Sequence, residues 1–215
     1  MSTIIDISRP LHTGMAVWPG DAPFESGWTG RIADGESCNV GKVSLSLHCG
    51  THVDAPYHID DNGRRIAGGH SASPDPLDAF IGEAQVVSLI GEPVVTADPL
   101  RARLQTGMKR LLLRTDSFPV GQFNRKYTWL SPDAARFLVD SRVTLIGIDT
   151  PSVDPFDSER LETHRVLAAA GVYILEGLDL SRVRDGHYEL VALPLRLSGM
   201  DASPVRAILR PVGVD

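Results

Sequence analysis

One short segment constrains this chain more than any other, because it concentrates side chains that can bind a metal. Residues 47–58 hold three of the chain's seven histidines together with an aspartate. The four side chains all fall at even positions: His48, His52, Asp54 and His58. Residues 43–48 alternate apolar and polar, which predicts a half-buried strand with Val43 toward the core and His48 at its end.

The spacing of the histidines requires a bend in the chain. On a straight strand His48 and His52 would lie about 13 Å apart, at roughly 3.3 Å per residue. Ligands of one metal ion have donor atoms only about 3–4 Å apart. The chain must therefore fold back between them, and Gly50 permits this. His52 and Asp54 then point the same way, and we expect Pro56 to keep the chain extended toward His58.

These residue types suit a particular class of metal. Imidazole nitrogens and carboxylate oxygens favour zinc or manganese over a soft metal. The alternative is a set of surface histidines with a turn aspartate, which an ordered cluster after a strand makes the weaker interpretation. On the residues alone, His164 within a helical segment and Glu176 after an apolar run are each interpreted as satisfied structural residues.

Several motifs resemble those of one known family, the metal-dependent cyclases and kynurenine formamidases. The segment HCGTHVDAPYH matches the signature HxGTHxDxPxH, and the likeness is specifically to the bacterial kynurenine formamidases, also called arylformamidases. It continues in WPGD at 18–21, IGIDTPSVDP at 146–155, ILEG at 174–177 and the tail ALPLRLSGMDASPVRAIL. The resemblance therefore spans nearly the whole chain.

The resemblance implies a dinuclear metal site, with zinc expected ahead of manganese and two divalent ions per subunit. It assigns His48, His52 and Asp54 to one metal, lets Asp54 reach a second held by His164, and gives Glu176 to the second metal or to a bridge. It further implies that Trp18 packs on an aromatic substrate and that His58 stays free of metal and transfers protons. The expected protein is a homodimer that hydrolyses N-formyl-L-kynurenine to L-kynurenine and formate, a step of tryptophan degradation.

Composition sets the outer limits of these expectations. A chain of 215 residues fits one domain, residues 1–215, and 42% hydrophobic with 22% charged residues is ordinary for a globular protein. A net charge of −6 argues against nucleic acid or an anionic membrane as partner. No signal peptide or membrane span is visible. The two cysteines, Cys38 and Cys49, do not suggest a disulfide framework, so the cytoplasm is expected.

Strand and helix patterns alternate through the middle of the chain and predict an α/β fold. Strands are expected at 83–90, 110–115, 143–149 and 172–175, and helices at 96–105, 131–140 and 158–170. Asp185-Gly186 predicts a hairpin, and residues 68–76 a long loop in which His70 is more readily solvated than metal-bound. Asp149 and Arg114, at strand ends, are interpreted as structural. The resemblance specifies the fold further as a mixed central sheet with packed helices, the swivelling β/β/α type of the cyclases.

Two other functions remain open at this point. A related hydrolase of a cyclic amide such as isatin, with one manganese, would have similar ligands, and His164, Glu176 and the tail argue against it. A non-catalytic metal-binding or scaffold protein would be expected to have lost part of the ligand set, which is complete here. The chain lacks a Gly-x-Ser-x-Gly motif, so the nucleophile elbow of serine hydrolases is missing.

Overall fold

The computed structural model describes residues 4–66, 77–119, 121 and 123–212 and has an α/β architecture. Its strands are β1 (Ile5–Asp6), β2 (Glu25–Gly30), β3 (Val40–Ser44), β4 (His52–Asp54), β5 (Ile81–Ser88), β6 (Val94–Val95), β7 (Arg110–Arg114), β8 (Trp129–Leu130), β9 (Leu145–Ile148), β10 (Tyr173–Glu176), β11 (Gly186–Val191), β12 (Ala202–Pro204) and β13 (Ile208–Pro211). The α-helices are α1 (Ala97–Arg103), α2 (Pro132–Asp140) and α3 (Glu162–Ala169).

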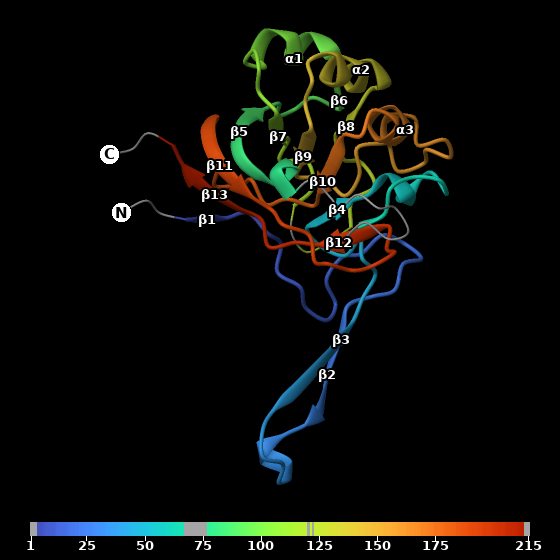
Figure 1. Cartoon of the computed structure of the whole chain (residues 1–215), viewed down its shortest axis with the longest axis vertical. Helices are drawn as coiled ribbons and strands as arrows, with labels where there is room; N and C mark the ends of the chain where they lie inside the picture. The colour runs from blue at the N-terminus through green and yellow to red at the C-terminus, as the bar shows by residue number, and fades with distance from the viewer. Residues whose placement is uncertain (1–3, 67–76, 120, 122, 213–215) are drawn as a thin grey trace.

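A mixed sheet of nine described strands forms the body, in the order β1-β13-β11-β5-β7-β9-β10-β4-β12. Strands β5, β7, β9 and β10 run parallel, while β11 and β4 pair antiparallel on either side of them. The short strands β6 and β8 form a separate parallel pair. The predicted alternation of strands and helices is confirmed, and Figure 1 shows the helices gathered over one side of the sheet.

Two apolar layers cover the faces of the sheet, because successive side chains of a strand point to opposite faces. Leu111 and Leu113 of β7 pack on the helix side, in a cluster with Leu100 of α1, Leu138 of α2 and Leu167 of α3. The intervening Leu112 enters a second cluster, which contains Val53 of β4, Leu175 of β10 and Leu209 of β13. Burial on both faces is typical of parallel strands and explains their continuous apolar sequence.

The predicted helices are present, but shorter than expected. Ser131 caps α2 by accepting a hydrogen bond from the backbone N of Ala134, with Pro132 in the first turn. Helix α3 begins only at Glu162, and Gly171 follows it with φ +73°. The backbone N of Val172 bonds the carbonyl of Leu167, as in a Schellman motif. No helix in the described part of the chain is long and apolar enough to cross a membrane.

Two sequence predictions about strands are wrong. The strand predicted at 43–48 ends at Ser44 as β3, and among the described strands it pairs with β2 alone, in an arm that projects from the body (Figure 1). All five residues of β3 are exposed, Val43 at 63%, so Val43 does not face a core. The hairpin predicted at Asp185-Gly186 is also absent, because β11 pairs with the distant β5 and β13. The loop predicted at 68–76, with His70, lies outside the described residues.

Candidate metal centre

Strands β4 and β10 bring three polar side chains together: His52 and Asp54 from β4, and Glu176 from β10. In their antiparallel pairing Glu176 lies directly opposite His52, and residues opposite each other point to the same face. Asp54, two residues after His52, shares that face. His52 Nε2 is therefore 3.4 Å from Asp54 Oδ1 and 3.5 Å from Glu176 Oε2. All three side chains are buried, and the expectation that His52 and Asp54 point the same way is confirmed.

Helix α3 packs on this face and adds His164. Its Nε2 lies 3.4 Å from Glu176 Oε1 and 3.6 Å from Asp54 Oδ2. Its other ring nitrogen, Nδ1, is 2.6 Å from a carboxylate oxygen of Asp154, which also accepts from the backbone N of His164. Asp154 thus turns Nε2 toward the cluster, the usual support for a histidine that binds metal.

The turn before β4 brings His48 back to His52, as predicted. Gly50 has φ +71°, and the rings of His48 and His52 lie 4.9 Å apart. His48 Nδ1 is 3.0 Å from Asp54 Oδ1. Backbone packs closely here, since a Cβ on Gly177 would lie 2.2 Å from the carbonyl oxygen of Gly50. The bend that the spacing required is therefore held by two glycines in contact.

His58 reaches the cluster by a different route from the one expected. The prediction that Pro56 keeps the chain extended is wrong. Pro56 is instead the first residue of η2 (Pro56–His58), one turn of 3-10 helix. The ring of His58 lies 4.2 Å from that of His48 and 5.8 Å from that of His164. The structure thus brings all four residues of the 47–58 segment together with His164 and Glu176.

The cluster fits a metal, on the evidence of atoms that lack partners. Among the described residues, three buried side-chain atoms make no hydrogen bond, namely His52 Nε2 and both carboxylate oxygens of Asp54. A buried carboxylate without a donor is costly, so such atoms indicate a site that suits a cation. Two sets have ligand atoms within 4.8 Å of one another: His48, Asp54 and His58, and His52, Asp54 and Glu176. Asp54 is common to both sets.

The electrostatics point the same way. Burial alone would lower the pKa of His48, but the carboxylates of Asp201 and Asp54, 2.9 Å and 3.0 Å from its ring nitrogens, outweigh burial and raise the pKa to about 9. Burial of His52 is likewise outweighed, by the charge of Asp54 above all, and its pKa rises to about 10. The same histidines hold the pKa of Asp54 well below its usual range, although burial opposes this. The carboxylates around these histidines therefore stabilise positive charge at this site, whether on the imidazole rings or on a metal ion.

An aromatic-walled cavity of about 430 Å³ opens beside the cluster, within the usual size range of small-molecule sites. His48, His52, His58, His164 and Glu176 contribute to its lining. Trp18 also lines it and packs against Phe156 and Phe123, with ring centroids 5.0 Å and 5.5 Å away. Trp18 is thus placed where it can contact a bound molecule, beside two aromatic rings that sequence reasoning did not single out.

Sequence reasoning also missed two aspartates. Asp154 orients His164, and Asp201 lies 2.9 Å from His48 Nε2 and 3.4 Å from His58 Nδ1. Both lie inside motifs quoted for the family resemblance, which was the available signal. Asp149, interpreted as structural, accepts hydrogen bonds from Thr115 and the backbone N of Asp116, and Arg114 pairs with Asp116.

Comparison with known proteins shows that the chain is similar to hydrolases, some of which are described as metal-dependent. The family described as "Putative cyclase" matches residues 5–155. The kynurenine formamidase of Bacillus cereus (strain ATCC 10987 / NRS 248) is 40% identical over 209 residues, 97% of each chain. A solved structure of a predicted metal-dependent hydrolase from Bacillus stearothermophilus has a TM-score of 0.84 and 28% identity, over 98% of each chain.

A more distant likeness concerns the fold alone. An isatin hydrolase bound to the product analogue thioisatinate has a TM-score of 0.81 at 20% identity, and the match covers 98% of this chain and 92% of the other.

Proposed function

The chain belongs to the cyclase family, and on that premise we propose that it hydrolyses the formamide of N-formyl-L-kynurenine to L-kynurenine and formate. The observation that carries the proposal is the group of partnerless buried atoms on His52 and Asp54 beside an aromatic-walled cavity. The 40% identity to a kynurenine formamidase over 97% of both chains supports the substrate. We further propose that residues 1–215 form one domain of this type.

We propose that the site holds two divalent metal ions, zinc ahead of manganese. The carboxylate oxygens of Asp54 point apart: Oδ1 lies near His48 and His52, and Oδ2 near His164. The two carboxylate oxygens of Glu176 also face different histidines, Oε2 toward His52 and Oε1 toward His164. One metal would thus be held by His48, His52 and Asp54, and the other by His164 with Asp54 and Glu176. When bound, such ions polarise a carbonyl and make hydroxide available near neutral pH.

The cavity would orient the aryl formamide. Trp18, backed by Phe156 and Phe123, offers an aromatic surface on which the ring of the substrate can pack. The formyl group would then face the histidine cluster, which lines the same cavity.

His58 would carry the proton. Hydrolysis breaks the bond between the formyl carbon and the anilino nitrogen, and that nitrogen must gain a proton as it leaves. His58 lines the cavity, and its Nδ1 contacts Asp201. An imidazole so placed can deliver the proton through its other nitrogen.

A direct assay tests the function. Purified protein, loaded with zinc and separately with manganese, is followed by absorbance on N-formylkynurenine and on isatin, with metal content measured on the same samples. We expect turnover of N-formylkynurenine and two metal ions per chain. Turnover of isatin alone, with one metal ion, would replace the proposal by the cyclic-amide reaction, and no turnover of either would leave a metal-binding protein.

Two further expectations concern the whole protein. We propose a homodimer, because the arm formed by β2 and β3 carries exposed apolar side chains. We also propose a cytoplasmic location, in keeping with cysteines that form no disulfide: Cys38 is exposed and Cys49 is buried.

A further inference from the structure

One carboxylate oxygen holds two of the histidines at once. Asp201 Oδ2 lies 2.9 Å from His48 Nε2 and 3.4 Å from His58 Nδ1. Asp201 stands 153 and 143 positions after these histidines, so the fold rather than the local chain creates the contact. The two rings are themselves in contact, with centroids 4.2 Å apart.

The backbone around Asp201 is fixed to the strand that carries Asp54. The carbonyl of Asp201 accepts a hydrogen bond from the backbone N of Ala55, at 2.8 Å. The next residue, Ala202, begins β12 and pairs directly with Asp54 of β4. The preceding carbonyl, of Met200, accepts from the backbone N of Ile66. Asp201 is therefore held in a defined place relative to the metal centre.

This placement decides which nitrogen of each ring is available. A neutral imidazole has one N–H donor and one acceptor nitrogen, and its hydrogen-bond partner selects the tautomer. An N–H that donates to Asp201 leaves the opposite nitrogen of the same ring free. For His48 the free atom is Nδ1, which faces Asp54 at 3.0 Å. For His58 it is Nε2.

We propose that Asp201 is a positioning residue that fixes His58 with Nδ1 protonated and Nε2 free for proton exchange, while it turns Nδ1 of His48 toward Asp54. The part that concerns His58 rests on the proposed hydrolysis, whereas the tautomer itself does not. Asp201 links proton transfer to metal binding, because a single oxygen serves both rings. Supporting carboxylates of this kind typically contribute about 10–100-fold to metal affinity or activity.

The test uses nitrogen NMR of the histidine rings in the zinc-saturated protein. In the wild type we expect His58 to carry its proton on Nδ1. In Asp201→Ala we expect a mixture of tautomers, and in Asp201→Asn, which keeps an acceptor oxygen, a return toward the wild-type signal. Glu83→Ala is the matched control, because it removes a histidine–carboxylate contact of the same type, 2.9 Å long, from His187 outside the cavity. His58 signals should be unchanged in that variant.

Kinetics separate a positioning role from a structural one. Asp201→Ala should lower kcat on N-formylkynurenine about 10–100-fold with little change in KM. If Asp201 acts on turnover through His58, then at saturating zinc, where the effect on metal affinity through His48 is removed, Asp201→Ala combined with His58→Ala should be no slower than His58→Ala alone. Thermal unfolding of each variant shows whether it folds. A wild-type tautomer of His58 in Asp201→Ala, or losses that multiply in the double variant, would overturn the proposal. A wild type that failed to hydrolyse the substrate would contradict the proposed function but leave the NMR result to decide the tautomer.

Discussion

At the scale of single residues, Asp54 is the side chain on which both halves of the metal centre depend. Its two oxygens face different histidines, and neither has a hydrogen-bond donor within the described residues. We therefore expect Asp54→Asn to lose both metal ions, as measured by metal analysis after dialysis. Asp149→Asn is the matched control, because Asp149 is equally buried but accepts its hydrogen bonds from Thr115 and Asp116. Retention of two metals by Asp54→Asn would disprove the bridging role.

His58 allows metal binding and proton transfer to be separated. We expect His58→Ala to keep its metals but to lose about 10²–10⁴-fold in kcat, the usual contribution of general acid–base catalysis. Formanilides with electron-poor rings expel a more stable nitrogen and need its protonation less, so the variant should be impaired less on them. Loss of one metal from His58→Ala would instead make His58 a ligand.

The raised pKa values of the histidines give a pH dependence with a definite sign. The nearby carboxylates of Asp201 and Asp54, acting against burial, raise the pKa of His48 to about 9, above the ordinary value near 6.5. In metal-free protein this contribution to stability is complete below about pH 6.5 and is lost as the pH rises through about 9. Zinc needs the neutral ring, so its affinity should rise over the same interval. Thermal unfolding with chelator, and zinc titration, each at pH 6.5 and 9, test both slopes.

Sequence alone identified the residues of this site that lie close together in the chain. The spacing of His48, His52 and Asp54 required a bend at Gly50, and the structure has it. His164 and Glu176 came only from the family resemblance, because a lone histidine in a helix and a carboxylate after a strand are each compatible with a structural role. Asp201 was missed because its partners are more than 140 positions away, and no local pattern reports such a contact.

At the scale of elements, the contact between two turns should control the site. Gly177 follows β10 with φ +65°, and a Cβ there would meet the carbonyl oxygen of Gly50 at 2.2 Å. Gly177→Ala should therefore cost the left-handed conformation, about 1–2 kcal/mol, and a further overpacking penalty of about 1–3 kcal/mol. Gly107→Ala, at φ +87° and with no atom of the described residues within 4 Å of the added Cβ, should cost only the first amount. Denaturant unfolding measures both, and equal losses would contradict the close contact.

The same scale shows where local patterns fail. The alternation at 43–48 predicted extended chain correctly only for Val43 and Ser44, since residues 47 and 48 lie in a turn, and alternation does not say what covers the apolar face. The buried strands at 110–115 and 143–149 were predicted well, because a run of apolar residues requires cover on both faces. Pro56 was misjudged for a related reason: proline suits the first turn of a helix as well as an extended chain, and only the surrounding fold decides.

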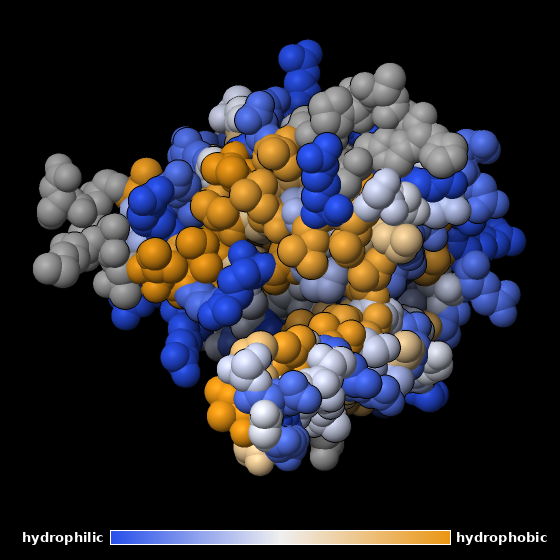
Figure 2. All heavy atoms as spheres, turned by 60° about the horizontal axis from the view of Figure 1, so that its bottom comes forward, coloured by the Kyte–Doolittle hydropathy of each residue, from blue (hydrophilic) through white to orange (hydrophobic). Residues whose placement is uncertain are grey.

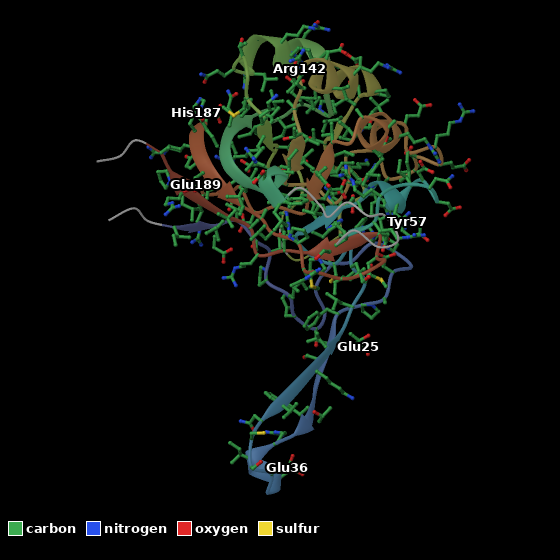
Figure 3. All side chains as sticks on the ribbon, in the orientation of Figure 1. Glu25, Glu36, Tyr57, Arg142, His187 and Glu189 are labelled. Carbon is green, nitrogen blue, oxygen red and sulfur yellow. The ribbon has the colours of Figure 1, made fainter. Side chains whose placement is uncertain are left out.

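At the scale of the whole molecule, the arm formed by β2 and β3 projects from the body and leaves apolar side chains exposed. Figure 3 shows Glu25 where the arm leaves the body and Glu36 near its tip. Trp28, Ile32, Val40 and Val43 of the arm are exposed, Trp28 at 57%. Figure 2 shows hydrophobic side chains on the arm and on the face of the body beside it. An isolated two-stranded hairpin is marginally stable in water, so a covering partner is expected.

A second copy of the chain is the partner we expect, because most soluble oligomers are symmetric pairs that use the same surface twice. Light scattering after size exclusion should then give twice the 23.3 kDa of the chain. Val43→Glu should shift the protein to monomer, since it places a charge in the covered surface. Ile90→Glu replaces a similarly exposed apolar residue, 56% against 63%, away from the arm and should leave the dimer intact. A monomeric wild type, or a dimer that Val43→Glu does not weaken, would show that the arm has another role.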